Sequence, residues 1–246
     1  MPEKFEGKVA VVTGGNSGIG LATARYLVSE GATVFVTGRR QAQLDQAVTE
    51  IGSTAIGVQG DVTSQADMDR LYQIVKERTG AVDIVVANAG EAFFARIGDY
   101  TDEVINQNFD LNLKGTIYTV QKALPLMRRG GAVVLIGSIE ALRGSENLGL
   151  YAASKAALRS FARTWSAELK ERGIRVNVIS PGVVFTPAYA TAGVSLRDLD
   201  AVIPHIPVGR LGTVEDIARA IGFLASEDSA FMTAAELVVD GGQTQV

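Results

Sequence analysis

Cysteine is absent from this chain of 246 residues, and histidine occurs only once. Without cysteine the chain has no disulfide, no thiolate metal site and no cysteine nucleophile. The single histidine, His205, stands between prolines in "PHIP", so a cluster of histidines around a metal is excluded and no metal site is expected. The sequence also lacks a G-x-S-x-G motif that would supply the nucleophile of a serine hydrolase.

Long apolar runs and long charged runs are missing as well. No apolar stretch approaches the roughly 18 residues needed to cross a bilayer, and charged residues occupy the N-terminal positions where a signal peptide is apolar. The net charge is -4, and arginines occur in pairs rather than in basic tracts, which disfavours nucleic acid as a partner. We therefore expect a cytoplasmic protein that binds neither nucleic acid nor membrane.

What the chain does contain is a globular composition, with 47% hydrophobic and 20% charged residues. Short apolar runs rich in β-branched residues alternate with longer segments of helical periodicity. Such runs are typical of parallel strands buried on both faces, so we predict a single α/β domain over 1–246, a doubly wound, Rossmann-type, seven-stranded parallel sheet with helices on both faces. The expected strands are 8–13, 33–37, 55–59, 83–87, 132–137, 175–180 and 236–240, and the expected helices are 18–30, 41–51, 64–79, 102–129, 150–172 and 213–226.

One long irregular segment interrupts this alternation after the sixth expected strand. Residues 181–212 include four prolines and exceed the length of a routine connection. Long loops in compact domains are often lids, and ligands of doubly wound sheets lie beyond the carboxyl ends of the strands. We therefore expect a substrate loop or lid at about 183–212.

A glycine-rich segment, "TGGNSGIG" at 13–20, follows the first expected strand and opens a helix. Glycine at this position lets backbone N–H groups approach a pyrophosphate, and the helix N-terminus adds a favourable partial charge. The loop partly imitates that of nucleoside triphosphatases, but Leu21 and Ala22 stand where lysine and serine or threonine are required. The segment therefore favours a dinucleotide over phosphoryl transfer, with a plain tight turn as the alternative.

The second expected strand ends in "VTGRR", where a site for NAD usually carries an acidic residue that holds the ribose 2′-hydroxyl. Arg39 and Arg40 occupy this place instead. An arginine suits a 2′-phosphate both by its charge and by its fork of donors. The sequence thus predicts NADP(H), although a solvated arginine pair is compatible with NAD.

"YAASK" places Tyr151 and Lys155 one turn apart on an expected helix. Lowering the pKa of a tyrosine from near 10 to about 7 requires roughly 4 kcal/mol of preferential stabilisation of the phenolate. A cation about 4 Å away supplies roughly that amount at an effective dielectric near 20. Alone, this pair would more often be partly solvated, but Ser138 ends the fifth expected strand and could donate to a carbonyl oxygen as charge develops there.

With these residues assembled, the chain resembles the short-chain dehydrogenase/reductase family from about residue 5 to the C-terminus. The motifs that carry the resemblance are "TGGNSGIG", "GDV" at 60–62, "ANAG" at 87–90, "NLKG" at 112–115, Ser138, "YAASK", "PG" at 181–182 and "VVDGG" at 238–242. Two positions depart from the family pattern: Ala87 stands where asparagine is usual, and Ala234 where glycine is common before the last strand.

The resemblance implies roles for four catalytic residues. Tyr151 would be the general acid/base, Lys155 would lower its pKa and hold the nicotinamide ribose, Ser138 would orient the substrate oxygen, and Asn112 would help hold a relay water. The residues that would contact the cofactor are Gly14, Asn16, Ser17, Gly18, Ile19, Gly20, Arg39, Arg40, Asp61, Val62, Asn88, Ala89, Gly90, Tyr151, Lys155, Pro181, Gly182, Val184 and Thr186.

Most candidate residues for the substrate pocket are apolar or aromatic, which favours a ketone of medium size. Two acidic residues close to the expected site, at 91 and 140, are interpreted as solvated carboxylates at its rim. The candidates are Glu91, Phe93, Glu140, Leu142, Leu148, Phe185 and Tyr189.

Three functions fit these observations. The leading one is an NADP(H)-dependent oxidoreductase that interconverts a small ketone and a secondary alcohol. A second is a 3-oxoacyl-carrier-protein reductase, which would need a basic docking patch, and a third is a dinucleotide-binding sensor without turnover. Family members commonly form homotetramers through the helices expected at 102–129 and 150–172. The arginines available for a docking patch are Arg128, Arg129, Arg163 and Arg172.

Overall fold

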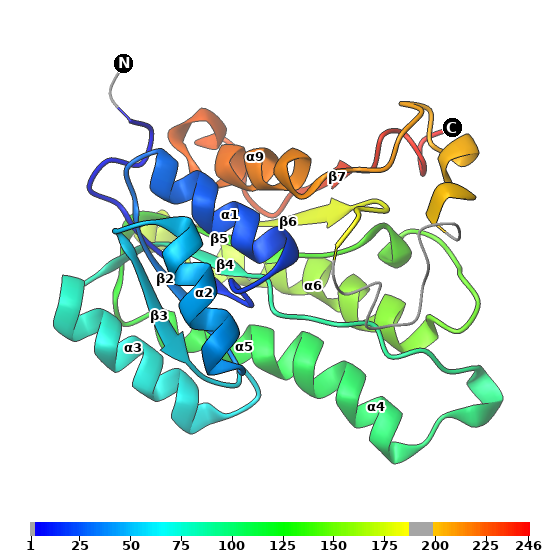
Figure 1. Ribbon diagram of the computed structural model, residues 1–246, viewed down its shortest axis with the longest axis horizontal. Coiled ribbons are helices and arrows are strands. Elements are labelled where there is room, and N and C mark those ends of the chain that lie inside the picture. The colour runs from blue at the N-terminus through cyan, green and yellow to red at the C-terminus, as the bar shows by residue number, and fades with distance from the viewer. Residues whose placement is uncertain (1–2, 187–198) are drawn as a thin grey trace.

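A seven-stranded sheet forms the centre of the computed structural model, which describes residues 3–186 and 199–246 (Figure 1). The strand order is β3-β2-β1-β4-β5-β6-β7, and every neighbouring pair is parallel. Because the order reverses between β1 and β4, a ligand crevice is expected beyond the carboxyl ends of these two strands. The strands are β1 Val9–Thr13, β2 Thr33–Gly38, β3 Ala55–Gln59, β4 Val82–Ala87, β5 Met127–Ile136, β6 Arg175–Pro181 and β7 Glu236–Val239.

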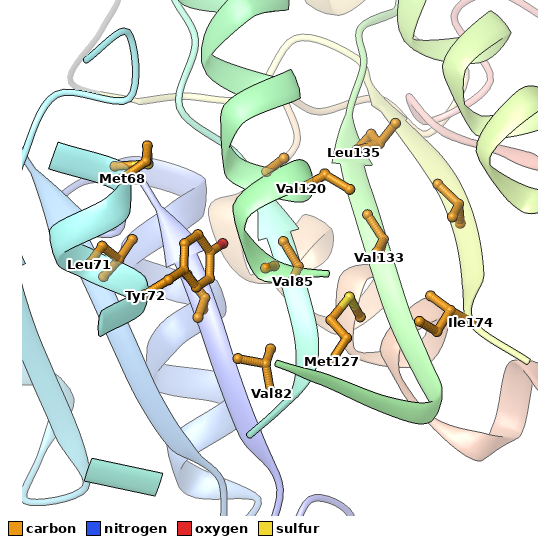
Figure 2. Packing of buried hydrophobic residues seen from close by; sticks show 14 of the residues in the cluster. Met68, Leu71, Tyr72, Val82, Val85, Val120, Met127, Val133, Leu135 and Ile174 are labelled. Carbon is orange, nitrogen blue, oxygen red and sulfur yellow. The ribbon is translucent and has the colours of Figure 1, made fainter. Parts of the chain in front are cut away.

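Helices cover both faces of this sheet. Alternate residues of β1 face opposite ways: Val9 and Val11 belong to one hydrophobic cluster, and Ala10 and Val12 to the other. The first cluster, which lies under α3 (Gln65–Thr79), α5 (Gly115–Ala123) and α6 (Gly149–Glu168), is seen from close by in Figure 2. The second lies under α1 (Gly18–Ser29), α2 (Gln41–Ile51) and α9 (Val214–Ala225). Burial on both faces explains the apolar strand sequences and confirms the predicted doubly wound fold.

The helices agree with the sequence expectation, apart from one segment. Their bounds are α1 Gly18–Ser29, α2 Gln41–Ile51, α3 Gln65–Thr79, α4 Asp102–Phe109, α5 Gly115–Ala123, α6 Gly149–Glu168 and α9 Val214–Ala225.

The continuous helix expected over 102–129 is wrong. A π-helical turn, Asp110–Lys114, separates α4 from α5, and residues 127–129 already belong to β5. Pro125 accounts for the early end, because proline cannot donate the next helical hydrogen bond and restricts the residue before it. The π turn matters for the site, since Asn112 lies in it.

The segment after β6 returns to the sheet edge, where Val184 forms an isolated bridge with Gly212. Tyr189 and the rest of 187–198, within the expected lid, lie outside the described residues. No helix in 3–186 or 199–246 is long and apolar enough to cross a membrane.

Candidate active site

The predicted catalytic residues come together at the carboxyl edge of the sheet. Gly90 follows β4, Ser138 follows β5, and Tyr151 and Lys155 lie in the first two turns of α6. Asn112 reaches the same place from the π turn between α4 and α5. Residues that are far apart in sequence thus meet because parallel strands end at one edge.

Lys155 is the buried cation of this group, with 5% of its surface exposed. Its Nζ donates a hydrogen bond of 2.8 Å to the carbonyl oxygen of Ile136, at the end of β5. Burial lowers the pKa of Lys155 from 10.5 to about 8. The lysine side chain is therefore still mostly charged at neutral pH, although burying this charge lowers the free energy of unfolding.

Tyr151 lies beside this cation, with the Lys155 Nζ 5.6 Å from the centre of its ring. Both side chains lie on the same side of α6 because they are one helical turn apart. The backbone around Tyr151 is also held, since the Ser154 hydroxyl donates 2.7 Å to the Tyr151 carbonyl oxygen. A positive charge at this position stabilises a phenolate more than a phenol.

Asn112 is completely buried and binds the backbone at Glu91 in both directions. Its Oδ1 accepts from the Glu91 N–H and its Nδ2 donates to the Glu91 carbonyl oxygen, each at 3.0 Å. A Cβ built on Gly90 would lie 2.7 Å from Asn112 Oδ1 and 3.0 Å from Lys155 Nζ. Glycine at position 90 therefore allows the asparagine and the lysine to approach the same point.

Ser138 caps the short 3-10 helix Ile139–Ala141 directly after β5. Its Oγ accepts a hydrogen bond of 3.1 Å from the Glu140 N–H, which leaves the hydroxyl proton available for another acceptor. The residue is 8% exposed. A fixed donor at this edge is suited to an oxygen that gains negative charge during a reaction.

The glycine-rich segment forms the turn between β1 and α1. Gly14 and Gly18 have φ values of 63° and 53°, which favour glycine. Ser17 is the N-cap of α1, and within the described chain its side chain makes no capping hydrogen bond to the first N–H groups of α1. Gly20 is buried beneath the turn, where a Cβ would overlap the carbonyl oxygen of Gly14.

Asn88 joins this turn to the end of β4. Its Nδ2 donates 2.8 Å to the Thr13 carbonyl oxygen and 3.2 Å to that of Gly14. The Thr13 hydroxyl in turn accepts from the backbone N–H groups of Asn88 and Ala89. The role of Thr13 was missed from the sequence, because a threonine at a strand end carries no distinctive signal.

A hollow of about 360 Å³ opens beyond the ends of β2 and β3. Arg39 contributes to its wall, as does Asp61, whereas Arg40 does not. The structure thus separates the two arginines that the sequence could not rank. The lining residues are Arg39, Gln59, Gly60, Asp61, Asp67 and Arg70.

The residues after β6 approach the glycine-rich turn from the other side. Thr186 Cγ2 lies 3.5 Å from the position of a Cβ on Gly18. A Cβ on Gly182 would lie 2.7 Å from Asp240, so only glycine lets this strand end pass beside the segment after β7. Val184 and Val62 are buried, and their side chains contact Gly212 and Gly115 rather than an open surface.

The substrate candidates fall into two groups. Leu142 and Phe185 are exposed by 39% and 52%, while Glu91, Phe93 and Leu148 are half-buried.

Glu140 corrects the interpretation as a solvated carboxylate, since it is buried. Its Oε1 accepts from both Nε and Nη2 of Arg143, the former at 2.9 Å. The guanidinium balances the charge that burial would otherwise penalise. The interpretation failed because the sequence spacing did not reveal this i, i+3 pair.

Together these groups can serve proton transfer to and from a carbonyl oxygen. A phenol stands beside a buried ammonium, a serine hydroxyl is fixed at the adjoining strand end, and an N–H-rich turn can accept a dinucleotide. Catalysis of this kind depends on holding the reacting groups in place before reaction.

Comparison with known proteins agrees with this arrangement. A family model described as "Enoyl-(Acyl carrier protein) reductase" matches residues 14–244. The chain is 45% identical over 246 residues to Oxidoreductase asL5 of Sarocladium schorii, covering 99% of this chain and 98% of that protein. It is 36% identical to the NADP-dependent (R)-specific alcohol dehydrogenase of Lentilactobacillus kefiri, covering 99% of each chain.

A solved structure is similar over the same extent. The short-chain dehydrogenase/reductase described as a glucose/ribitol dehydrogenase from Brucella melitensis superposes with a TM-score of 0.94 at 31% identity, covering 99% of each chain.

Proposed function

The chain belongs to the short-chain dehydrogenase/reductase family of oxidoreductases, and within that family we propose that it interconverts a ketone and a secondary alcohol by using NADP(H). The observation that carries this proposal is the placement of Tyr151 beside the buried ammonium of Lys155, at the sheet edge that Ser138 also reaches. A protein that only binds a nucleotide has no physical need for this combination.

The chain's own residues fit a dinucleotide. The turn at Gly14 and Gly18, with the N-terminus of α1 behind it, provides backbone donors for a pyrophosphate. The hollow beside Arg39 would take the adenosine end, and the residues around Gly90 and Thr186 would border the nicotinamide end. When bound, the nicotinamide supplies or accepts the hydride.

Three side chains would handle the proton and the substrate oxygen. In the reducing direction, Tyr151 donates its proton to the carbonyl oxygen, and the Ser138 hydroxyl donates a hydrogen bond to the same atom. The Lys155 ammonium stabilises the phenolate that this transfer leaves behind. Asn112 fixes the backbone at Glu91, next to Gly90, which borders the Lys155 ammonium.

Arg39 supports the choice of NADP(H). It is exposed, lines the hollow, and forms no ion pair with any residue in 3–186 or 199–246. A guanidinium without an internal partner is available to a phosphate, for which its planar donors are well suited. The relative from Lentilactobacillus kefiri is named as NADP-dependent, which adds support from similarity.

Two of the four arginines that could form a docking patch for an acyl carrier protein make contacts within the chain instead. Arg128 forms an ion pair of 2.7 Å with Asp83, and Arg172 donates to the carbonyl oxygens of Leu124 and Met127. These contacts favour a small ketone over a carrier-bound acyl group.

A homotetramer is the proposed assembly. It is supported by the half-buried, stacked rings of Phe161 and Trp165 on α6, whose centroids are 4.8 Å apart.

Initial rates of NADPH and NADH oxidation, measured with aliphatic ketones, aryl ketones and a 3-oxoacyl thioester, test the proposal. We expect turnover of a simple ketone with a strong preference for NADPH. Selective turnover of the thioester would favour the carrier-protein function instead. Cofactor binding without turnover of any substrate would support a sensor and contradict the proposal.

A further inference from the structure

The end of β3 and the start of α3 contribute residues to the hollow that Arg39 lines. Three of these residues, Gln59, Asp67 and Arg70, are not among those that the sequence singled out, yet they form a continuous series of hydrogen bonds that ends at Arg39. These hydrogen bonds bear on how the Arg39 side chain is held where it would bind a phosphate.

The first link runs from α3 to the last residue of β3. Arg70 Nη2 donates 2.7 Å to the carbonyl oxygen of Gln59, while Nη1 donates 2.8 Å to Asp67 Oδ1. A Cβ on Gly60 would lie 3.8 Å from Arg70 Nη2 and 3.3 Å from the Asp67 Cβ, so this strand end passes close to the pair. The guanidinium is therefore held at two points, although its side chain is 51% exposed.

The second link runs from β3 to Arg39. Gln59 Nε2 donates 3.0 Å to the carbonyl oxygen of Arg39, and the Gly60 N–H donates 3.1 Å to that of Gly38. Arg39 lies just beyond the end of β2, so the Gln59 side chain extends the tie between the two strands by one residue. The backbone from which the Arg39 guanidinium projects is thus fixed from outside its own strand.

The charges of the hollow also single out Arg39. Both oxygens of Asp67 are occupied, Oδ1 by Arg70 and Oδ2 by the Asp61 N–H at 2.9 Å, and these bonds lower the pKa of Asp67. Asp61 Oδ1 accepts from the N–H and the hydroxyl of Thr63. Asp67 and Arg70 therefore balance each other, which leaves Arg39 as the cation without a partner in the described hollow.

We propose that Gln59 and Arg70 are positioning residues that set Arg39 to select a 2′-phosphorylated dinucleotide. Gln59 holds the Arg39 backbone directly, and Arg70 holds Gln59. Fixing the base of a long side chain reduces the conformational freedom that is lost when its guanidinium binds a phosphate. This inference rests on the proposed use of NADP(H), and it extends the determinant of that preference from one residue to a chain of contacts.

Isothermal titration calorimetry with NADP⁺ and NAD⁺ tests the inference by binding alone. Gln59→Met is the decisive variant, because it removes the donor to Arg39 while changing neither charge nor length appreciably. The loss of one solvent-accessible hydrogen bond is expected to weaken NADP⁺ binding roughly three- to tenfold. NAD⁺ affinity should fall less than NADP⁺ affinity, so the ratio of the two Kd values should drop, and an unchanged urea midpoint shows that the variant is folded. Equal losses for the two cofactors would overturn the inference.

Arg70→Lys separates positioning from charge. It keeps the positive charge in the hollow but not the planar fork that reaches Asp67 and Gln59 together. We expect it to lose NADP⁺ affinity as well, whereas a purely electrostatic role would leave it like the parent and overturn the positioning role of Arg70. The matched controls are Gln73→Met and Arg78→Lys, which alter exposed residues farther along α3 and should change neither affinity.

Arg39→Met distinguishes failure of the inference from failure of the proposed function. If Arg39→Met abolishes the NADP⁺ preference and Gln59→Met retains it, Gln59 is not a positioning residue and NADP(H) use still stands. If the parent shows no preference, or Arg39→Met keeps it, the cofactor assignment is wrong and the inference falls with it.

Discussion

The buried ammonium of Lys155 lowers the stability of the fold but is needed for the proposed proton transfer. Replacing Lys155 with methionine tests both effects. The side chain is almost fully buried, and its pKa falls from 10.5 to about 8 because burial penalises the ammonium. Methionine has a similar length and carries no charge, so Lys155→Met removes that penalty. The same change removes the cation beside Tyr151 and is expected to abolish turnover.

The magnitude follows from the pKa. At about 1.4 kcal/mol for each pKa unit, holding the ammonium in the folded protein costs about 3 kcal/mol at neutral pH. The variant also loses the hydrogen bond from Nζ to the Ile136 carbonyl oxygen, which offsets roughly 1 kcal/mol. We therefore expect the free energy of unfolding at pH 7 to be about 2 kcal/mol higher in Lys155→Met than in the parent.

The sign of the pH dependence provides a second check. Between pH 8 and 10.5 the unfolded chain binds more protons at this lysine than the folded chain, so the stability of the parent rises with pH relative to the variant. Urea unfolding of both proteins without cofactor at pH 7 and pH 10 measures the difference. An advantage of the variant that stays constant or grows at pH 10 would refute the reasoning.

Three further substitutions test individual features of the fold. Ala234→Gly is expected to raise the free energy of unfolding by about 1 kcal/mol, because Ala234 has a φ of 58°; a lower urea midpoint would contradict this. Gly20→Ala should abolish NADP⁺ binding in calorimetry, since its Cβ would overlap the Gly14 carbonyl oxygen, whereas Gly98→Ala, with open space around it, should bind normally. Thr213→Ala removes the capping box of α9 and should lower the free energy of unfolding by about 1 kcal/mol; an unchanged urea midpoint would argue against the cap.

The strands could be predicted almost completely because the central ones are buried on both faces. Strands that are buried on both faces consist of consecutive apolar residues, which can be recognised in the sequence. All seven expected strands are present in the structure. The expected helix at 102–129 failed for a related reason. The π turn occupies a single turn between two helical segments, which is too short to be located from the hydrophobic pattern.

Sequence spacing by itself predicts a contact in the site where a single helix brings two residues together, whereas the roles of Ser138 and Asn112 were predicted from the family resemblance. Tyr151 and Lys155 meet this condition, since one helical turn suffices to bring them together. Gln59, Arg70 and Asp67 do not, because their contacts depend on how α3 and β3 sit beside Arg39 in three dimensions. The pairing of Glu140 with Arg143 was missed likewise, because Arg143 lies in the irregular segment that follows the short 3-10 helix Ile139–Ala141.

The rate of NADPH-dependent ketone reduction by Tyr151→Phe, compared with the parent, tests the central claim most directly. Phenylalanine keeps the ring beside Lys155 and removes only the hydroxyl that would transfer the proton. We predict a loss of roughly 10²- to 10⁴-fold in kcat, with a much smaller change in NADPH affinity in a parallel titration. Turnover at the parent's rate would show that Tyr151 is not the general acid and would contradict the account.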